Sequence, residues 1–113
     1  MKKKSLAAKK RIHKSLLIHL KDTRVNKVFI GLKNYLDKFI SNKNKIGVAI
    51  SGGPDSLALA FLTKCYQLLN NLDAKFFIVD HRLRKESSKE AKLTMLLLKK
   101  FDIDCKIFKW RGK

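Results

Sequence analysis

A short apolar run meets a pair of glycines in residues 46–56, IGVAISGGPDS, and this stretch decides the fold. A continuous apolar run that follows the polar residues 41–45 and ends at glycine is typical of a buried strand. Residues 55–69 are apolar on most sides, which predicts a helix that is covered on more than one face and is closed by Asn70-Asn71. The stretch therefore predicts a strand, a glycine turn and a helix, the first unit of an α/β fold.

The same alternation continues along the chain. A second apolar run, residues 76–79, is followed by a basic loop and by a Ser-x-x-Glu capping box from Ser87 to Glu90, which starts a helix predicted to end near Phe101. Residues 105–110 predict a third strand. This order favours right-handed crossovers and a parallel sheet. Parallel sheets are seldom so small, so we expect either truncation after the third strand or a partner that completes the sheet.

The front of the chain has a different pattern. Residues 1–22 are rich in lysine and weakly periodic, which favours a mobile or loosely helical arm. From Val25 to Ile40 apolar residues recur at spacings of three and four, which predicts an amphipathic helix. We therefore divide the chain into a basic arm with an amphipathic helix, residues 1–44, and a partial α/β domain, residues 45–113.

The chain is strongly basic, with 27 Lys and Arg against 9 Asp and Glu and a formal net charge of +18. Residues 1–45 hold 14 basic and 2 acidic side chains (net +12), and residues 46–113 hold 13 and 7 (net +6). Such an excess favours polyanions and makes the front segment the candidate surface for them. It is equally typical of a lysine-rich surface whose charges are only solvated.

The two cysteines and the lengths of the apolar runs indicate the cellular compartment of the protein. Cys65 and Cys105 are far apart, without Cys-x-x-Cys or a histidine at ligand spacing, so neither a disulfide framework nor a zinc site is indicated. The longest early apolar run, residues 16–18, is too short for a signal-peptide core or a membrane span. We therefore expect reduced thiols, a cytoplasmic location and no membrane partner.

The glycine turn predicts a phosphate site. The amides of Gly52, Gly53, Asp55 and Ser56 can point into one concavity at the start of a helix, where the helix dipole adds positive potential for an anion. Pro54 fits the first helical turn, because its missing N–H would have no partner there.

The side chains of this turn fit a phosphate that carries a metal ion. Ser51 and Ser56 supply hydroxyls that can donate to phosphate, whereas Asp55 would repel phosphate unless a divalent cation lay between them, so we assign Asp55 to magnesium. The alternative is a simple turn with an Asp or Ser cap. The spacings of the Walker loop and of the dinucleotide-binding glycine motif are both absent.

Two stretches carry a family resemblance. The turn from Ser51 to Ser56 resembles the Ser-Gly-Gly-x-Asp-Ser signature of the ATP-pyrophosphatase, or PP-loop, superfamily, which implies a Rossmann-like sheet of the adenine-nucleotide alpha-hydrolase type. Residues 78–87, IVDHRLRKES, resemble the Val-Asp-His-x-Leu-Arg-x-Glu-Ser stretch of tRNA(Ile)-lysidine synthases. The resemblance covers roughly residues 45–110.

The resemblance implies an ATP-dependent tRNA-modifying ligase. Such enzymes adenylate the C2 oxygen of the wobble cytidine in the CAU anticodon of tRNA(Ile), and L-lysine then displaces AMP to give lysidine. It implies ATP and Mg²⁺ as cofactors, Asp55 as the catalytic and metal-binding carboxylate, and Asp80 and His81 in the nucleotide crevice, at the end of the second strand. In the alternative interpretation Asp80 caps its loop and His81 is a surface residue.

Other functional classes stay open. Members of this family run well beyond the third strand and carry a second acidic metal motif, so we expect catalysis to require downstream sequence or a second polypeptide. A nucleotide-binding remnant without catalysis is one alternative, and a small basic RNA-binding protein with an incidental loop is another. Among other PP-loop tRNA-modifying enzymes, the thiolating ones usually carry a Cys-x-x-Cys that this chain lacks.

Overall fold

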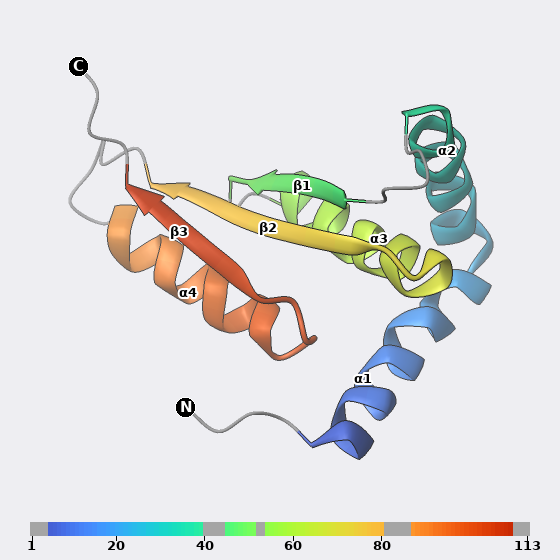
Figure 1. The fold of residues 1–113 in the computed structure, drawn as a ribbon, viewed down its shortest axis with the longest axis horizontal. Helices are drawn as coiled ribbons and strands as arrows, with labels where there is room; N and C mark the ends of the chain where they lie inside the picture. Colours follow the sequence, from blue (N-terminus) through green and yellow to red (C-terminus); the bar gives the residue numbers. More distant parts are fainter. Residues whose placement is uncertain (1–4, 40–44, 52–53, 81–86, 110–113) are drawn as a thin grey trace.

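The computed structural model describes residues 5–39, 45–51, 54–80 and 87–109, in which helices and strands alternate around a parallel sheet (Figure 1). The elements are α1 (Leu6–Ile18), the 3-10 helix η1 (His19–Lys21), α2 (Thr23–Phe39), β1 (Lys45–Ile50), α3 (Pro54–Asn70), β2 (Asp73–Asp80), α4 (Ser87–Lys99) and β3 (Cys105–Lys109). The described strands form one parallel sheet in the order β1-β2-β3. The predicted α/β class is confirmed, and β2 is longer at both ends than predicted.

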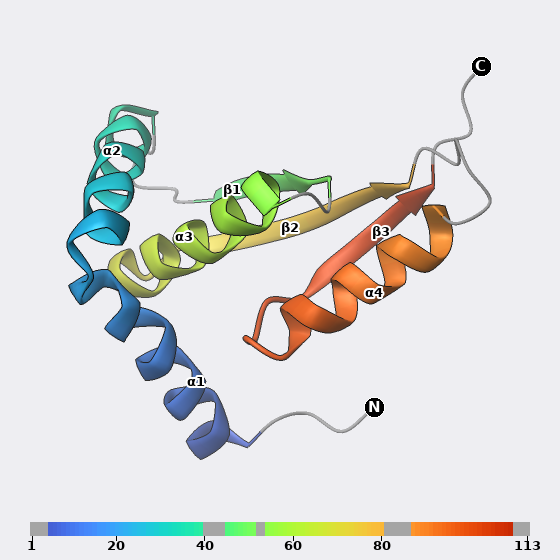
Figure 2. The same cartoon turned by 180° about the vertical axis from the view of Figure 1, so that it is seen from behind.

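One face of the sheet is covered by the two crossover helices. Alternate residues of β1 and β2 are buried on this face and pack with residues of α3 and α4. Figure 2 shows α3 in front of the sheet on this side. The buried cluster consists of Val48, Ile50, Ala60, Phe76, Ile78, Ala91, Leu98 and Ile103.

The opposite face of the sheet carries aromatic side chains that no described helix covers. The rings of Phe77 and Phe108 lie 5.3 Å apart, and Phe108 is 51% exposed. Gly47 leaves room for the first ring, because a Cβ at this position would lie 3.3 Å from Phe77 Cε2. Since parallel sheets are normally covered on both faces, this one has an open apolar side.

Helix α3 is packed on two sides, as predicted. Its inner side meets the sheet, and its outer side meets α1 and α2 through a second apolar cluster that includes Leu16, Phe29 and Tyr66. The helix ends at Asn70 because Asn71 adopts a left-handed backbone with φ 53°, a conformation that asparagine tolerates better than most residues. Sequence analysis had placed the end of the helix at this Asn pair.

The front segment is more regular than predicted. In place of a loose arm, α1 is a helix whose N-cap Ser5 accepts a 3.1 Å hydrogen bond from the Ala8 amide. Its apolar side, with Leu16 buried, packs against α3. The weak periodicity of α1 did not predict this packing, because polar contacts as well as apolar ones hold the helix in place. Within the described ranges, no helix combines the length and apolarity needed to cross a bilayer.

A half-buried carboxylate connects α1 to the turn before β3. Asp102 Oδ2 lies 2.7 Å from His13 Nε2 and 3.8 Å from Lys64 Nζ, and its backbone is left-handed with φ 59°. A carboxylate only accepts, so the imidazole nitrogen donates this bond. Burial alone would raise the pKa of Asp102, but the His13 bond and the charges of Lys64 and Lys9 together lower it.

We expect Asp102→Asn to lower the free energy of unfolding by about 1–3 kcal/mol, because it leaves the Lys64 ammonium without its nearest charge partner. Asparagine tolerates the left-handed backbone, so strain does not contribute. The lowered pKa of Asp102 means that its contribution is present above its unfolded pKa, about 3.9, and is lost as pH falls through the folded value.

Urea denaturation at pH 7 and at pH 3 tests this, with Asp104→Asn at a neighbouring exposed carboxylate as the control. The difference between Asp102→Asn and the parent protein should shrink at pH 3. Equal losses in the Asp102 and Asp104 variants would contradict a specific role for this carboxylate.

Candidate functional site

The glycine turn lies at the carboxyl edge of the sheet. β1 ends at Ile50, which pairs with Ile78 of β2, and α3 starts at Pro54. Asp80 is the last residue of β2, so its backbone lies at the same edge as Ser51 (Figure 1). Ligands of open parallel sheets bind at this edge. The topology therefore places Ser51, the first residue of the glycine turn, and Asp80, from the second predicted stretch, at the same edge of the sheet.

A short hydrogen bond closes the turn. The Ser51 amide donates to Ser56 Oγ over 2.7 Å, which ties the end of β1 to the first turn of α3. A hydroxyl has one hydrogen and two lone pairs, so Ser56 can accept this bond and still donate its own hydrogen to a phosphate oxygen. The half-buried position of Ser56 fixes that donor at the helix N-terminus, where the dipole favours an anion.

Asp55 lies beside this donor in the first turn of α3, and its side chain is exposed. A carboxylate is a hard oxygen ligand of the kind that Mg²⁺ takes together with substrate phosphates and water. The chemistry of the residues present, two serines and one carboxylate at a helix N-terminus, therefore fits a phosphate chain with its magnesium ion. In the described part of the chain, no three His, Cys, Asp or Glu side chains cluster in a way that could hold a metal ion.

The structure reaches five of the eight predicted site residues. The side chains of Ser51, Asp55 and Ser56 and the backbones of Pro54 and Asp80 are described and lie at one edge of the sheet. The remaining predicted residues, Gly52, Gly53 and His81, lie outside the described residues. The roles assigned to all of these residues stay predictions.

Sequence analysis missed the polar cluster of His13, Lys64 and Asp102 at the other end of the molecule. One signal was available. After Asp55, Lys64 is the only charged residue in the otherwise apolar α3, and the structure leaves it 7% exposed. A lone lysine inside a helix that is apolar on most sides predicts a buried charge with a partner.

The sequence matches the model of a known domain family. Residues 23–113 match the PP-loop domain. The chain belongs to the PP-loop domain family. Membership implies ATP binding. The match starts at the first residue of α2, so α1 and η1 precede it. The boundary between residues 44 and 45 stays a prediction.

Several curated proteins are similar to this chain. A tRNA(Ile)-lysidine synthase of Bartonella henselae is 38% identical over 71 residues, which cover 61% of this chain and 14% of the relative. One of Rickettsia rickettsii is 43% identical over 60 residues, 53% of this chain and 12% of the relative. A probable tRNA(Ile)-lysidine synthase of Schizosaccharomyces pombe is 36% identical over 73 residues, which cover 58% of this chain and 16% of the relative. The chain thus spans a small part of these relatives, and the predicted resemblance is confirmed.

Proposed function

We propose that this PP-loop chain is the ATP-binding part of a tRNA-modifying ligase of the tRNA(Ile)-lysidine synthase type. The observation that carries the proposal is the 2.7 Å bond from the Ser51 amide to Ser56 Oγ at the carboxyl edge of a PP-loop sheet. The similarity to proteins named tRNA(Ile)-lysidine synthase supports this reaction within the family.

In the proposed reaction the C2 oxygen of the wobble cytidine attacks the α-phosphorus of ATP, and the bond to pyrophosphate breaks. The amides of the turn and the Ser56 hydroxyl hold the departing pyrophosphate, whose charge grows as the bond breaks. Asp55 would hold Mg²⁺, which when bound would supply positive charge to offset this build-up. The amino group of L-lysine then displaces AMP from C2 and gives lysidine. Asp80 and His81 are proposed to line the nucleotide crevice.

We infer two partners, one from the charge of the front segment and one from the open sheet. Residues 5–39 hold 9 Lys and Arg against 2 Asp, and this basic surface fits the phosphates of tRNA(Ile). The open face with the exposed Phe108 is where a further polypeptide segment, in the same chain or in a second one, would cover the sheet, and a further strand would extend the sheet at the outer edge of β1 or β3. A cytoplasmic location stays part of the proposal.

Nucleotide binding without catalysis is the second candidate. The turn alone can hold ATP, whereas the lysine and anticodon sites have no counterpart assigned among the described residues.

Incubation of the chain, together with the downstream sequence or second polypeptide that catalysis is expected to require, with α-labelled ATP, Mg²⁺ and a tRNA(Ile) transcript with a CAU anticodon tests the proposal. Labelled AMP should appear only when L-lysine is present, and a transcript with a UAU anticodon is the matched control. ATP binding without lysine-dependent AMP would favour the second candidate. AMP release from both transcripts would argue against lysidine formation, and absence of ATP binding would overturn both candidates.

A further inference from the structure

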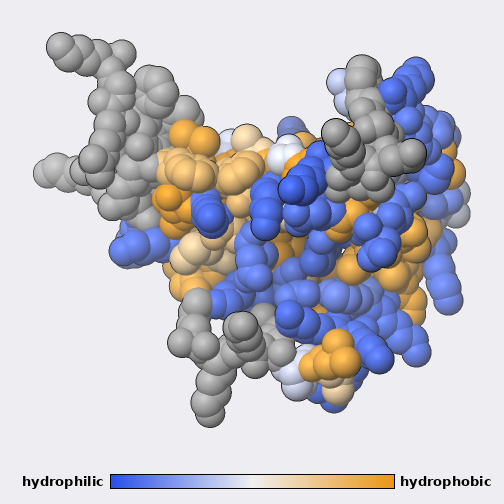
Figure 3. Space-filling view, in the orientation of Figure 1, coloured by the Kyte–Doolittle hydropathy of each residue, from blue (hydrophilic) through white to orange (hydrophobic). Residues whose placement is uncertain are grey.

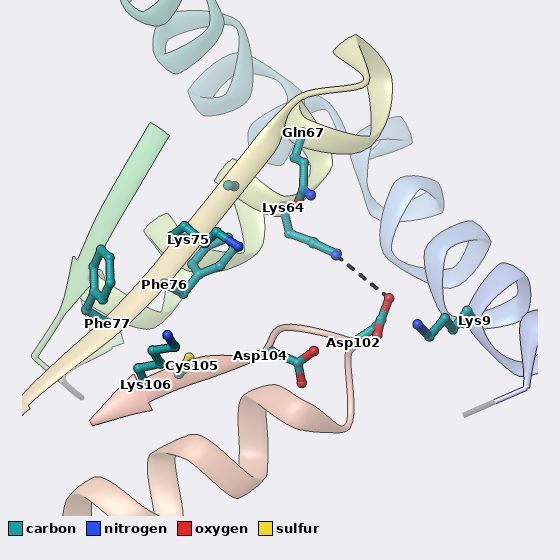
Figure 4. A pocket seen from close by; sticks show the side chains of 11 residues that line it. Lys9, Lys64, Gln67, Lys75, Phe76, Phe77, Asp102, Asp104, Cys105 and Lys106 are labelled. Atoms are coloured by element: carbon teal, nitrogen blue, oxygen red, sulfur yellow. Dashed lines mark ion pairs between the residues drawn. The ribbon is translucent and has the colours of Figure 1, made fainter. Parts of the chain in front are cut away.

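A cavity of about 460 Å³ lies at the amino end of the sheet, away from the PP-loop turn (Figure 4). It is bounded by α1, α3, the start of β2 and the turn before β3. Lys75 in its wall is five residues before Asp80, so the cavity lies roughly 16 Å from the carboxyl edge at about 3.3 Å per residue. Hydrophilic side chains predominate over this region in Figure 3. The cavity is therefore separate from the proposed ATP site.

Lysines from four elements converge on this cavity. Lys9 comes from α1, Lys64 from α3, Lys75 from β2 and Lys106 from β3. Lys75 also lies 3.9 Å from Asp73 at the exposed surface. Two acidic residues of the turn before β3 share the wall, so the lining has an excess of two positive charges. Such an excess in a hollow attracts an anion with more than one charge.

Lys64 is the most buried of these lysines. Its side chain is 9% exposed, and desolvation lowers its pKa although the charges of Asp102 and Asp104 oppose the shift. Asp102 is 3.8 Å away, beyond ordinary hydrogen-bond length, and is already bonded to His13 at 2.7 Å. An ammonium has three donors, so an anion in the cavity could take a direct bond from Lys64 and lessen the cost of its burial.

Gln67 provides a second, independent sign of a ligand. Its Oε1 is buried and has no hydrogen-bond partner among the described residues, although the side chain lines the same cavity. An unsatisfied buried acceptor costs about 1–3 kcal/mol, so it favours a ligand that brings a donor. Because this oxygen has almost no accessible surface, the amide must turn toward the cavity before a hydroxyl group next to the anionic group can satisfy it.

We propose that this cavity binds a ribose 5-phosphate unit, either free or at the 5′ end of an RNA. The phosphate dianion matches the excess of two positive charges and bonds to Lys64, and a sugar hydroxyl donates to Gln67 Oε1. The volume suits a ligand of this size. Lys9 lies on α1, which precedes the PP-loop match, whereas the other lining residues lie within it. The proposal does not depend on the proposed ligase reaction, because the cavity is at the opposite end of the sheet from the proposed ATP site.

Isothermal titration calorimetry at constant ionic strength tests the site with ribose 5-phosphate, inorganic phosphate and unphosphorylated ribose. Ribose 5-phosphate should bind about tenfold more tightly than phosphate, the equivalent of one good hydrogen bond. Lys64→Met should weaken both by about tenfold or more, whereas Gln67→Met should remove only the preference for the sugar. The control Lys27→Met removes one exposed charge on α2 and should change neither.

Should Lys64→Met fail to fold, Lys106→Ala at an exposed position of the wall serves instead. Asp55→Asn should leave this binding unchanged, which separates the result from the fate of the ATP site. Short RNAs with a 5′-phosphate or a 5′-hydroxyl distinguish the two sources: binding of the phosphorylated RNA alone assigns the site to RNA ends, and binding of the free sugar phosphate alone assigns it to the metabolite. No binding of either, or equal weakening by Lys27→Met, would overturn the proposal.

Discussion

Asp55→Asn should weaken magnesium-dependent ATP binding by about tenfold to a hundredfold, the loss expected for one charge-assisted contact. The reason is electrostatic. Asp55 is exposed in the first turn of α3, beside Ser56 and its phosphate donor, so without a cation its carboxylate repels the nucleotide. With Mg²⁺ present the same carboxylate becomes a ligand. Its exposure also means that the substitution should cost little stability, about 0.3–1 kcal/mol at the helix N-terminus.

Calorimetric titration of ATP with MgCl₂ and with EDTA provides the measurement. The parent protein should bind more tightly with Mg²⁺, whereas Asp55→Asn should bind equally well or better in EDTA, because it has lost the repulsion. Asp73→Asn removes an exposed carboxylate at the opposite end of β2 and is the matched control. Equal weakening of Asp55→Asn with and without Mg²⁺ would show that Asp55 does not act through the metal.

The elements that sequence analysis located correctly depend on local chemistry. β1 and the start of α3 were found because an apolar run, a glycine pair and a proline occur within residues 46–56. The capping box starting at Ser87 placed the start of α4, and the Asn pair placed the end of α3. These signals lie within a few residues of the feature that they determine. The carboxyl-edge location of the turn then follows from the chain direction, because the turn comes directly after β1 and parallel strands end at the same edge of the sheet.

The features that sequence analysis missed depend on contacts between distant residues. His13 and Asp102 are 89 positions apart, and no local pattern couples them. Lys64 interrupts an apolar helix, but only the folded chain shows that α1 and the turn before β3 enclose it. The cavity with its convergent lysines is therefore a tertiary feature. The individual lysines can be read from the sequence, but the sequence does not show that they line one cavity.

Leu98→Ala is expected to destabilise the chain by about 3 kcal/mol, within the range measured for buried leucines in other proteins. Leu98 is fully buried, at 0% exposure, in the cluster that joins α4 to the sheet. The loss combines the removed apolar surface with the cavity left behind, and a rigid strand on the other side limits collapse around it. For a domain of this size the melting temperature should fall by roughly 12–24 °C.

Leu96→Ala in the same helix is the matched control, because Leu96 is 51% exposed and its truncation leaves no internal cavity. Its effect should stay within about 0.5 kcal/mol. Urea denaturation separates the two variants, and an unchanged m-value would show that the midpoint reports stability alone. The contrast depends on α4 presenting Leu98 to the sheet and Leu96 to solvent. Comparable losses in both variants would mean that α4 is covered on its outer side as well, as it would be if a partner or a further segment packed against it.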